Sequence, residues 1–181
     1  MDLNRHFFNR DAADVAMRLI GSSFKVGRVG GIIVETEAYK PGDRASHSFV
    51  GPTLRNSSMF GEAGHAYVYR SYGLHWCFNI VCSAGSAVLI RALEPKWGLA
   101  LMTERRRNQP LHRLCAGPGC LTEALNITRA HDGKDLLAPP FTIALAPSQP
   151  ILVGVRIGIT KDADLPWRFG LEGSAFLSRK F

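Results

Sequence analysis

Long apolar runs are missing from this chain. No stretch of its 181 residues approaches the roughly 20 consecutive apolar residues of a membrane-spanning helix. Residues 1–6 lack the apolar core of a signal peptide, and we find neither a low-complexity tract nor an internal repeat. These absences exclude a membrane span and a solenoid. They lead us to expect a folded cytosolic protein that has no membrane partner.

Cysteine is scarce, and its spacing does not indicate a metal centre. The four residues are Cys77, Cys82, Cys115 and Cys120. They form two C-x4-C pairs in apolar surroundings, whereas a zinc ribbon uses C-x2-C. We therefore expect reduced thiols in the core and no disulfide framework. His65, His75 and Cys77 are an alternative metal-ligand set, but lone histidines near tyrosines are more often hydrogen-bonded side chains. We expect neither a metal nor a cofactor.

Acidic residues are outnumbered by basic ones. The chain has 15 Asp and Glu against 22 Lys and Arg, and its isoelectric point is near 9.6. A basic chain attracts polyanions, so nucleic acid is the leading candidate partner, although many small basic proteins bind no polyanion. With 181 residues, the chain is long enough to bury a sizeable core, and we expect one domain over residues 1–181.

Short strands outnumber helices in the expected secondary structure. A helix is expected over residues 9–20, with Asn9 or Asp11 as its N-cap and Gly21 at its end. The long connection over residues 40–64 is rich in turn-forming residues, and loops of that length are usually functional. The remaining expected elements are strands within 25–39, 66–69, 76–81, 87–93, 141–146, 151–159 and 167–171, and helices over 97–108 and 121–126.

Several basic or glycine-rich segments allow two interpretations. The run Arg105-Arg106-Arg107 suits a helix C-terminus and phosphate contacts equally well. Gly117-Pro118-Gly119 opens a helix whose amides could hold a phosphate, although an ordinary loop-to-helix junction is more common. Arg156 lies between two apolar residues of an expected strand, and we expect it to face outward.

The segment 34–39 combines acid with an aromatic side chain. In a strand, alternation places Glu35, Glu37 and Tyr39 on one face and small or apolar residues on the other. A half-buried carboxylate in such a place can act as a base. The alternative is a solvated strand face without a function.

Tyrosines follow at positions that a core does not require. Tyr67 and Tyr69 share one strand face, and Tyr72 lies beside a glycine at the tip of an expected hairpin between residues 70 and 74. A side chain at a hairpin tip contacts a partner or acts as a wedge in a base stack. Aromatic pairs elsewhere can stack on an unstacked base.

Taken in order, these segments resemble the alkyladenine (3-methyladenine, alkylpurine) DNA glycosylases. The resemblance covers residues 12–177, and each motif is weak by itself while the ordered set is specific. The motifs are Val34-Glu35-Thr36-Glu37-Ala38-Tyr39, Ala45-Ser46-His47-Ser48, Thr53-Leu54-Arg55-Asn56, Met59-Phe60, Tyr67-Val68-Tyr69, Ser71-Tyr72-Gly73, Cys77-Phe78-Asn79 and Leu89-Ile90-Arg91-Ala92-Leu93-Glu94-Pro95.

The resemblance implies a catalytic pair. Glu37 matches the general base that deprotonates a water for attack on C1′ of the deoxyribose. Arg91 matches the cation that helps to hold this water and carboxylate. No lysine matches a Schiff-base nucleophile, so the resemblance implies a monofunctional hydrolase that leaves an abasic site without cutting the strand.

The resemblance also implies how a damaged base is held. Tyr39, His47 and Tyr69 match residues that surround the flipped base. Asn79 matches the position that crowds the 2-amino group of guanine. Tyr72 matches the side chain inserted into the duplex where the nucleotide leaves.

For the whole molecule, the resemblance implies one DNA glycosylase domain of mixed α+β class. Its fold is a curved, largely antiparallel sheet with a protruding β-hairpin and surrounding short helices. The expected function is base-excision repair of alkylated or deaminated purines, such as 3-methyladenine and hypoxanthine, in double-stranded DNA. The expected form is a monomer in a bacterial-type cytoplasm, associated with the nucleoid.

Two alternatives use the same residues differently. Glu35 and Glu37 could be the two carboxylates of a sugar hydrolase, but residues i and i+2 of a strand point the same way, whereas such enzymes need acids on opposite sides of a bond. A non-catalytic module that binds damaged DNA would explain the charge and the tyrosines. It would not require Glu37 to be paired with Arg91, and we expect Glu35 to have no catalytic part.

Overall fold

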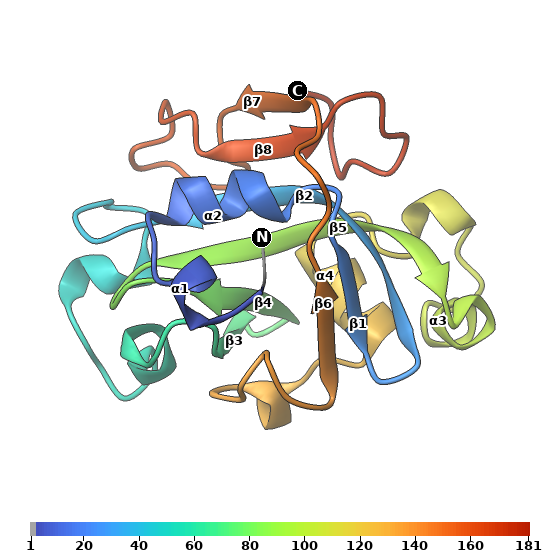
Figure 1. Ribbon diagram of the computed structural model, residues 1–181, viewed down its shortest axis with the longest axis horizontal. Coiled ribbons are helices and arrows are strands. Elements are labelled where there is room, and N and C mark those ends of the chain that lie inside the picture. Colours follow the sequence, from blue (N-terminus) through green and yellow to red (C-terminus); the bar gives the residue numbers. More distant parts are fainter. Residues whose placement is uncertain (1–2) are drawn as a thin grey trace.

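A curved antiparallel sheet organises the protein in this computed structural model, which describes residues 3–181. Six of its strands follow the order β3-β4-β5-β2-β1-β6, and β8 pairs with both β2 and β7 (Figure 1). The strands are β1 (Ser23–Val26), β2 (Val29–Tyr39), β3 (Ala66–Ser71), β4 (His75–Val81), β5 (Ala87–Trp97), β6 (Phe141–Ala144), β7 (Ile151–Gly154) and β8 (Arg168–Leu171). The expected mixed α+β fold with an antiparallel sheet is confirmed.

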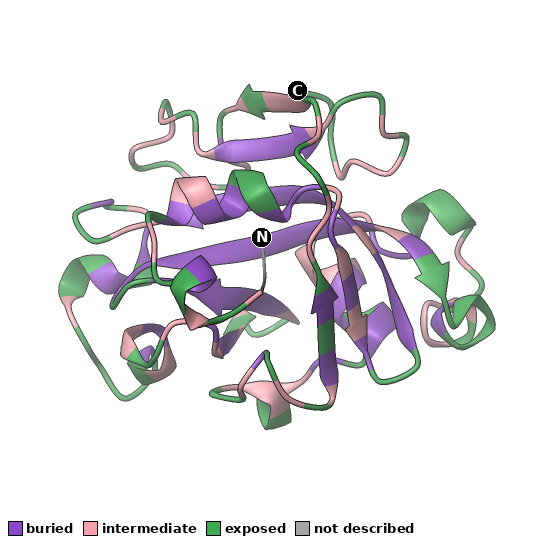
Figure 2. Ribbon diagram, in the orientation of Figure 1, coloured by how far each residue is buried: buried purple, intermediate pink, exposed green. Residues whose placement is uncertain are grey.

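Strand β2 is held along both of its edges. One edge pairs with β5, and the other pairs first with β1 and then, at Glu35–Glu37, with β8. Strands β2 and β5 are buried along most of their length (Figure 2). Side chains on the second half of β2 therefore start from a backbone that is fixed on both sides.

Within residues 3–181, four short helices and four 3₁₀ turns surround the sheet. The helices are α1 (Arg5–Phe8), α2 (Ala12–Leu19), α3 (Leu99–Arg105) and α4 (Pro118–Leu125). The 3₁₀ turns are η1 (His47–Val50), η2 (Ser57–Phe60), η3 (Leu111–Arg113) and η4 (Arg129–His131). Among residues 3–181, no helix has the length and apolar character that a membrane crossing requires.

Helix α2 shows how the local sequence sets an element. The Asp11 carboxylate accepts from the Ala13 amide at 2.9 Å, which makes Asp11 the N-cap. The predicted helix over residues 9–20 is therefore too long at its start, because Asn9 instead ends the separate helix α1. The buried face of α2 consists of Ala12, Val15, Ala16 and Leu19.

Other predicted boundaries also differ from the structure, some too long and some too short. Strand β5 extends to Trp97, and helix α3 begins only after Gly98. The left-handed φ of 71° at Gly98 separates the strand from the helix. Helix α4 begins at Pro118, which suits a first helical position. The predicted strand over residues 151–159 is wrong beyond Gly154, because Arg156 leaves the sheet to bind elsewhere.

The two faces of β2 have different neighbours. The hydroxyl of Thr36 donates to the Ala16 carbonyl at 3.0 Å, so this face of the strand packs on α2. Glu35, Glu37 and Tyr39 lie on the opposite face by strand alternation. The sequence pattern thus predicted the correct face for all three.

Strands β3 and β4 form the expected protruding hairpin. Its turn is closed by the Leu74 amide, which donates to the Ser71 carbonyl at 2.9 Å. Tyr72 and Gly73 between them have positive φ angles of 49° and 69°, as both central residues of a type I′ turn do. Tyr72 is 85% exposed at the tip.

Candidate functional site

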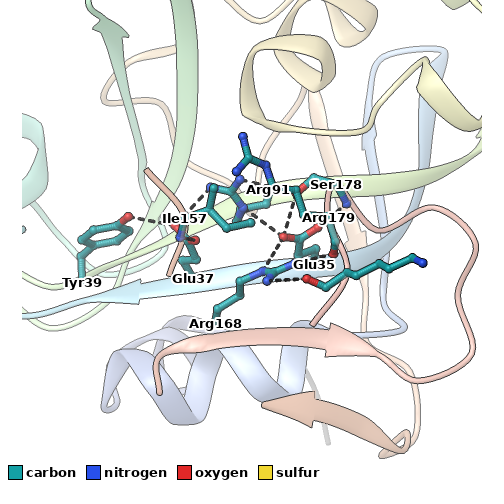
Figure 3. Close-up of polar contacts among 9 residues, drawn as sticks. Glu35, Glu37, Tyr39, Arg91, Ile157, Arg168, Ser178 and Arg179 are labelled. Atoms are coloured by element: carbon teal, nitrogen blue, oxygen red, sulfur yellow. Dashed lines mark hydrogen bonds and ion pairs between the residues drawn. The ribbon is translucent and has the colours of Figure 1, made fainter. Parts of the chain in front are cut away.

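Glu37 is a buried carboxylate held by three residues. The Tyr39 hydroxyl donates to Oε2 at 2.8 Å, the Ile157 amide donates to Oε1 at 2.8 Å, and Arg91 Nη1 lies 3.3 Å from Oε2 (Figure 3). Its side chain has no exposed surface. All three partners line a cleft of about 730 Å³. Glu37 therefore lies directly behind the wall of this cleft, with both oxygens oriented.

Arg91 reaches the acidic face through a β-bulge. Glu35 pairs with Ala92 and Thr36 with Ile90, so Arg91 is the extra residue on β5. Bulges often re-aim a side chain beside an active site. Burial opposes the charged form of Arg91, but the nearby Glu37 and Glu35 outweigh it, and the pKa of Arg91 is raised above its ordinary value. The guanidinium is therefore cationic.

Glu35 is buried as well, so the alternative of a solvated strand face for this segment is wrong. Its side chain has no exposed area, and Arg91 and Arg168 both donate to Oε1, from 3.1 and 2.8 Å. The backbone amide and the hydroxyl of Ser178 complete its shell. Surrounded in this way, Glu35 cannot act as the second carboxylate of a sugar hydrolase, which supports its expected exclusion from the chemistry.

The expectation that Arg156 faces outward is also wrong. Arg156 forms a solvent-excluded ion pair with Asp43 and donates to the Ala38 carbonyl at 3.1 Å. Its guanidinium also lies over the Tyr39 and Trp167 rings, at 4.7 and 5.1 Å from their centroids. The buried cation fixes the chain next to Ile157, which is the residue that donates to Glu37.

Tyr39 closes one side of the site. Burial, followed by the charge of Glu37, raises the pKa of Tyr39 well above its ordinary value. The hydroxyl therefore keeps its proton at neutral pH and remains a donor to Glu37. Its ring is available as a flat wall of the cleft.

His47, Tyr67 and Tyr69 form an aromatic cluster beside Tyr39. His47 Nδ1 lies 2.8 Å from the Tyr67 hydroxyl, and the His47 ring meets Tyr69 edge to face, with 4.4 Å between centroids. This packing removes part of the hydration of His47, and together with the charge of Arg55 it lowers the pKa of His47. The imidazole is therefore neutral near pH 7.

Asn79 lies deeper than the other predicted residues. It is buried, and its amide donates to the Tyr67 carbonyl at 3.0 Å. Asn79 lines an inner cavity of about 20 Å³ together with Tyr39, His47, Tyr69 and their neighbours, which is roughly the room that one water needs. The inner cavity shares Tyr39, Ala45, His47 and Tyr69 with the large cleft.

The rim of the cleft carries the hairpin tip and basic side chains. Tyr72, Gly73 and Arg70 line it from the hairpin, and Arg55 lines it from the connection between β2 and β3. Arg55 Nη2 also donates to the Arg70 carbonyl at 3.4 Å, which joins the two segments.

The basic run at the end of α3 has a structural use. Arg105 donates to the Ala124 carbonyl at 3.0 Å, and Arg106 donates to the Leu114 carbonyl at 3.2 Å and pairs with Glu123. Arg105 and Arg106 therefore have structural contacts at the end of the helix, which is the first of the two interpretations of this run. Arg107 is exposed.

The cysteines are unpaired thiols, as expected. Cys77, Cys82 and Cys115 are buried, and Cys120 is half-buried. Within residues 3–181, no three His, Cys, Asp or Glu side chains are grouped as a metal site would need. His65 instead lies 3.2 Å from Arg5, beside the Arg5–Asp135 ion pair.

Three contributors to the site were missed in the sequence. They are the Ile157 amide, Arg168 and Ser178. Ile157 acts through its backbone amide, which leaves no residue-type signal, and Ser178 acts through its amide and its hydroxyl from a position 143 residues beyond Glu35. Arg168 stands in the Trp167-Arg168-Phe169 segment, and its side chain could be paired with Glu35 only once β8 was known to lie beside β2.

Comparison with known proteins agrees with this arrangement. The family described as Methylpurine-DNA glycosylase (MPG) matches residues 6–175. A protein of Agrobacterium fabrum named "Putative 3-methyladenine DNA glycosylase" is 58% identical over 181 residues, which cover 99% of this chain and 94% of that protein. A protein of Rhizobium meliloti with the same name is 57% identical, over 97% of this chain and 95% of that protein. The chain therefore belongs to the methylpurine-DNA glycosylase family.

Proposed function

We propose that this DNA glycosylase flips an alkylated or deaminated purine out of duplex DNA and hydrolyses its N-glycosidic bond with a water activated by Glu37. The observation that carries the proposal is the position of Glu37. Its carboxylate is excluded from bulk solvent, yet each of its three partners lines the cleft. A base in that position can act on one bound water without being solvated itself.

The charges around Glu37 suit an oxocarbenium-like sugar. As the glycosidic bond breaks, positive charge develops at the sugar, and a nearby carboxylate stabilises it. Arg91 Nη1 lies 3.3 Å from Glu37 Oε2, and the same nitrogen can help to hold the water. The water attacks C1′, Glu37 takes its proton, and the purine leaves with the bonding electrons.

Aromatic residues provide a place for the extruded base. Tyr39, His47 and Tyr69 converge on the boundary between the large cleft and the inner cavity. Stacking on aromatic side chains contributes on the order of 1–3 kcal/mol per base. A neutral His47 can also exchange a hydrogen bond with the base edge.

Asn79 gives the pocket a basis for refusing guanine. Its amide is held by the Tyr67 carbonyl, so it cannot swing aside without losing that bond. An additional 2-amino group would meet this fixed side chain, whereas an adenine-derived lesion or hypoxanthine has none. Steric rejection of one competitor is a common source of specificity.

Tyr72 is the proposed wedge. Extruding a nucleotide costs a few kcal/mol, least for a damaged or mispaired base. An exposed aromatic ring at the tip of a rigid hairpin can fill the gap that remains in the stack. The reaction is proposed to stop at hydrolysis, because no lysine is present among the described residues that line the cleft.

Replacement of Glu37 by Gln tests the mechanism. We expect Glu37→Gln to abolish release of 3-methyladenine and hypoxanthine from defined duplexes in single-turnover assays. Binding of the same duplexes should persist, since the isosteric amide keeps the shape of the site. Glu94→Gln is the matched control, because Glu94 lies on β5 but pairs with Lys96 away from the cleft. Unaltered release by Glu37→Gln would reject the mechanism, and no release by the parent protein would favour a non-catalytic binding module.

A further inference from the structure

Glu35 accepts four hydrogen bonds from three neighbouring residues. Oε1 accepts from Arg91 Nε at 3.1 Å, Arg168 Nε at 2.8 Å and the Ser178 hydroxyl at 2.9 Å. Oε2 accepts from the Ser178 backbone amide at 2.5 Å. Desolvation opposes the burial of a carboxylate, and a buried salt bridge is weak evidence for stability, so we look for a role of Glu35 at the neighbouring site.

The last residues of the chain reach the site through Arg168. Its Nη2 donates to the Arg179 carbonyl at 2.6 Å, and its Nη1 donates to the Lys180 carbonyl at 3.3 Å. The Phe181 ring lies 3.8 Å from the Arg168 guanidinium and covers Gly170 of β8. Residues Ser178–Phe181, which we call the tail strap, are therefore fastened to the acidic face of β2, and Figure 3 shows Ser178 and Arg179 of this strap beside Glu35.

The side chains of Arg179 and Lys180 are not the groups that make these contacts. Both residues are exposed, and Arg168 binds their backbone carbonyls. The cluster itself contains two carboxylates, Glu35 and Glu37, and two guanidiniums, those of Arg91 and Arg168. The tail strap thus contributes hydrogen bonds to a cluster whose ionic charges already balance.

Glu35 determines how Arg91 meets Glu37. Arg91 uses Nε for Glu35 and presents only Nη1 to Glu37, at a single oxygen. Without Glu35, the guanidinium would be free to form the bidentate pair that arginine and carboxylate prefer. A bidentate pair would add a second Arg91 donor at Oε1, where the Ile157 amide already donates, so that fewer lone pairs of Glu37 remain to accept a proton from water.

We infer that Glu35 and the tail strap are a positioning assembly that holds Arg91 in single-point contact with Glu37, and that base release depends on this orientation. The inference rests on the proposed function of Glu37. Glu35 is a positioning residue in this inference and not a catalytic one, because its side chain has no exposed surface and acts on Glu37 only through Arg91.

Removal of residues 178–181 tests the assembly. We expect the truncated chain to release hypoxanthine on the order of 10- to 100-fold more slowly in single turnover, as is typical when a catalytic group is misplaced. Its dissociation constant for the same duplex should stay within about twofold, because the strap lies behind the site. The matched control is the double variant Arg179→Gln/Lys180→Gln, which removes the same two positive charges but keeps the backbone carbonyls. An equal loss of rate in this control would overturn the inference in favour of phosphate contacts.

A double-mutant cycle separates positioning from general support of the fold. If the strap acts through Arg91, truncation should alter the rate by less than about twofold in an Arg91→Lys background, because coupled residues are not additive. Equal loss in both backgrounds would overturn the inference. Should the truncated chain fail to fold, Ser178→Ala removes the hydroxyl contacts to Glu35 and to Arg91 Nη2, at 2.9 and 3.4 Å, and is read in the same cycle. Glu37→Gln is assayed in parallel to separate the two proposals. If Glu37→Gln abolishes base release but the truncated chain releases the base at the parent's rate, only the positioning assembly is rejected.

Discussion

Arg156 and Asp43 form an ion pair with no solvent-exposed side-chain surface. The pair joins the loop after β7 to the loop after β2, the two segments on either side of Tyr39. The Arg156 guanidinium also lies over the Tyr39 ring, 4.7 Å from its centroid, and its neighbour Ile157 donates to Glu37. One buried cation therefore fixes both the wall of the cleft and the amide that orients the proposed base.

Replacement of Arg156 by Met should reduce both stability and activity. Loss of one partner leaves a buried, unpaired carboxylate at Asp43, which costs about 3–5 kcal/mol. The Ile157 amide should also lose its fixed place, and single-turnover base release should slow. Urea denaturation and release of hypoxanthine from a duplex measure the two effects.

The exposed pair of Arg44 and Asp162 provides the control for Arg156. Arg44→Gln breaks an ion pair in the same loop region, but Arg44 is 60% exposed, so stability and rate should hardly change. The double variant Arg156→Met/Asp43→Leu should regain stability, because an apolar pair can replace a buried ion pair. If Arg156→Met alone matched the parent in both assays, the buried pair would have no positioning role.

Tyr72 occupies a backbone conformation that is unfavourable for tyrosine. Its φ of 49° lies in the left-handed region, which costs most residues about 1–2 kcal/mol and is tolerated best by Gly and Asn. Tyr72→Asn should therefore raise the free energy of unfolding by about 1 kcal/mol. The same change should weaken capture of a lesion in duplex DNA, because the ring that fills the stack is lost.

Stability and lesion capture should thus move in opposite directions in Tyr72→Asn. Thermal denaturation gives the first quantity, and single-turnover release from duplex and single-stranded substrates gives the second. The defect should be confined to the duplex, since a single strand needs no wedge. Equal defects on both substrates would contradict the wedge assignment.

Asn79→Ala should relax the choice of base. The change opens the inner cavity and leaves the Tyr67 carbonyl without its side-chain donor, at a cost of about 1–3 kcal/mol. We expect guanine-derived lesions to be released faster, while release of hypoxanthine falls or stays level. Ser86, also buried and near this region of the sheet, gives a control in Ser86→Ala, which should keep the parent's selectivity. An unaltered ratio of the two lesions in Asn79→Ala would reject its gating role.

Local sequence predicted the parts of the site that depend on short periodicities. Alternation along one strand placed Glu35, Glu37 and Tyr39 on a common face, and a glycine after Tyr72 indicated the hairpin tip. Each of these relationships spans only a few residues. They required no knowledge of which strands pair.

Long-range relationships could not be predicted in the same way. The prediction that Arg156 faces outward assumed that residues 151–159 form one strand. The chain instead leaves the sheet after Gly154, and Arg156 pairs with Asp43, which is distant in the sequence. The bulge that aims Arg91 depends on the register between β2 and β5. Ile157 acts through an amide that every residue except proline has, so its identity carries no signal.

Tyr39→Phe isolates the hydroxyl that donates to Glu37. The ring and its contact with Arg156 remain, while the 2.8 Å hydrogen bond to Oε2 is lost. A hydrogen bond to a charged group contributes about 1.5–3 kcal/mol, so the variant should be less stable than the parent at neutral pH by an amount of that order. Base release should slow, because one of the three groups that orient Glu37 is missing.

The stability difference between Tyr39→Phe and the parent should depend on pH in the alkaline range. Burial and the charge of Glu37 raise the pKa of Tyr39 above its ordinary value of 10.0, so above pH 10 the unfolded chain releases this proton while the folded chain keeps it. The contribution of Tyr39 is therefore complete below pH 10 and is lost as the pH rises toward the folded-state pKa. Urea denaturation from pH 8 upward should show the parent losing more stability than Tyr39→Phe, whose ring cannot ionise. Parallel curves for the two proteins would mean that Tyr39 ionises equally in the folded and unfolded states, contrary to its burial against Glu37.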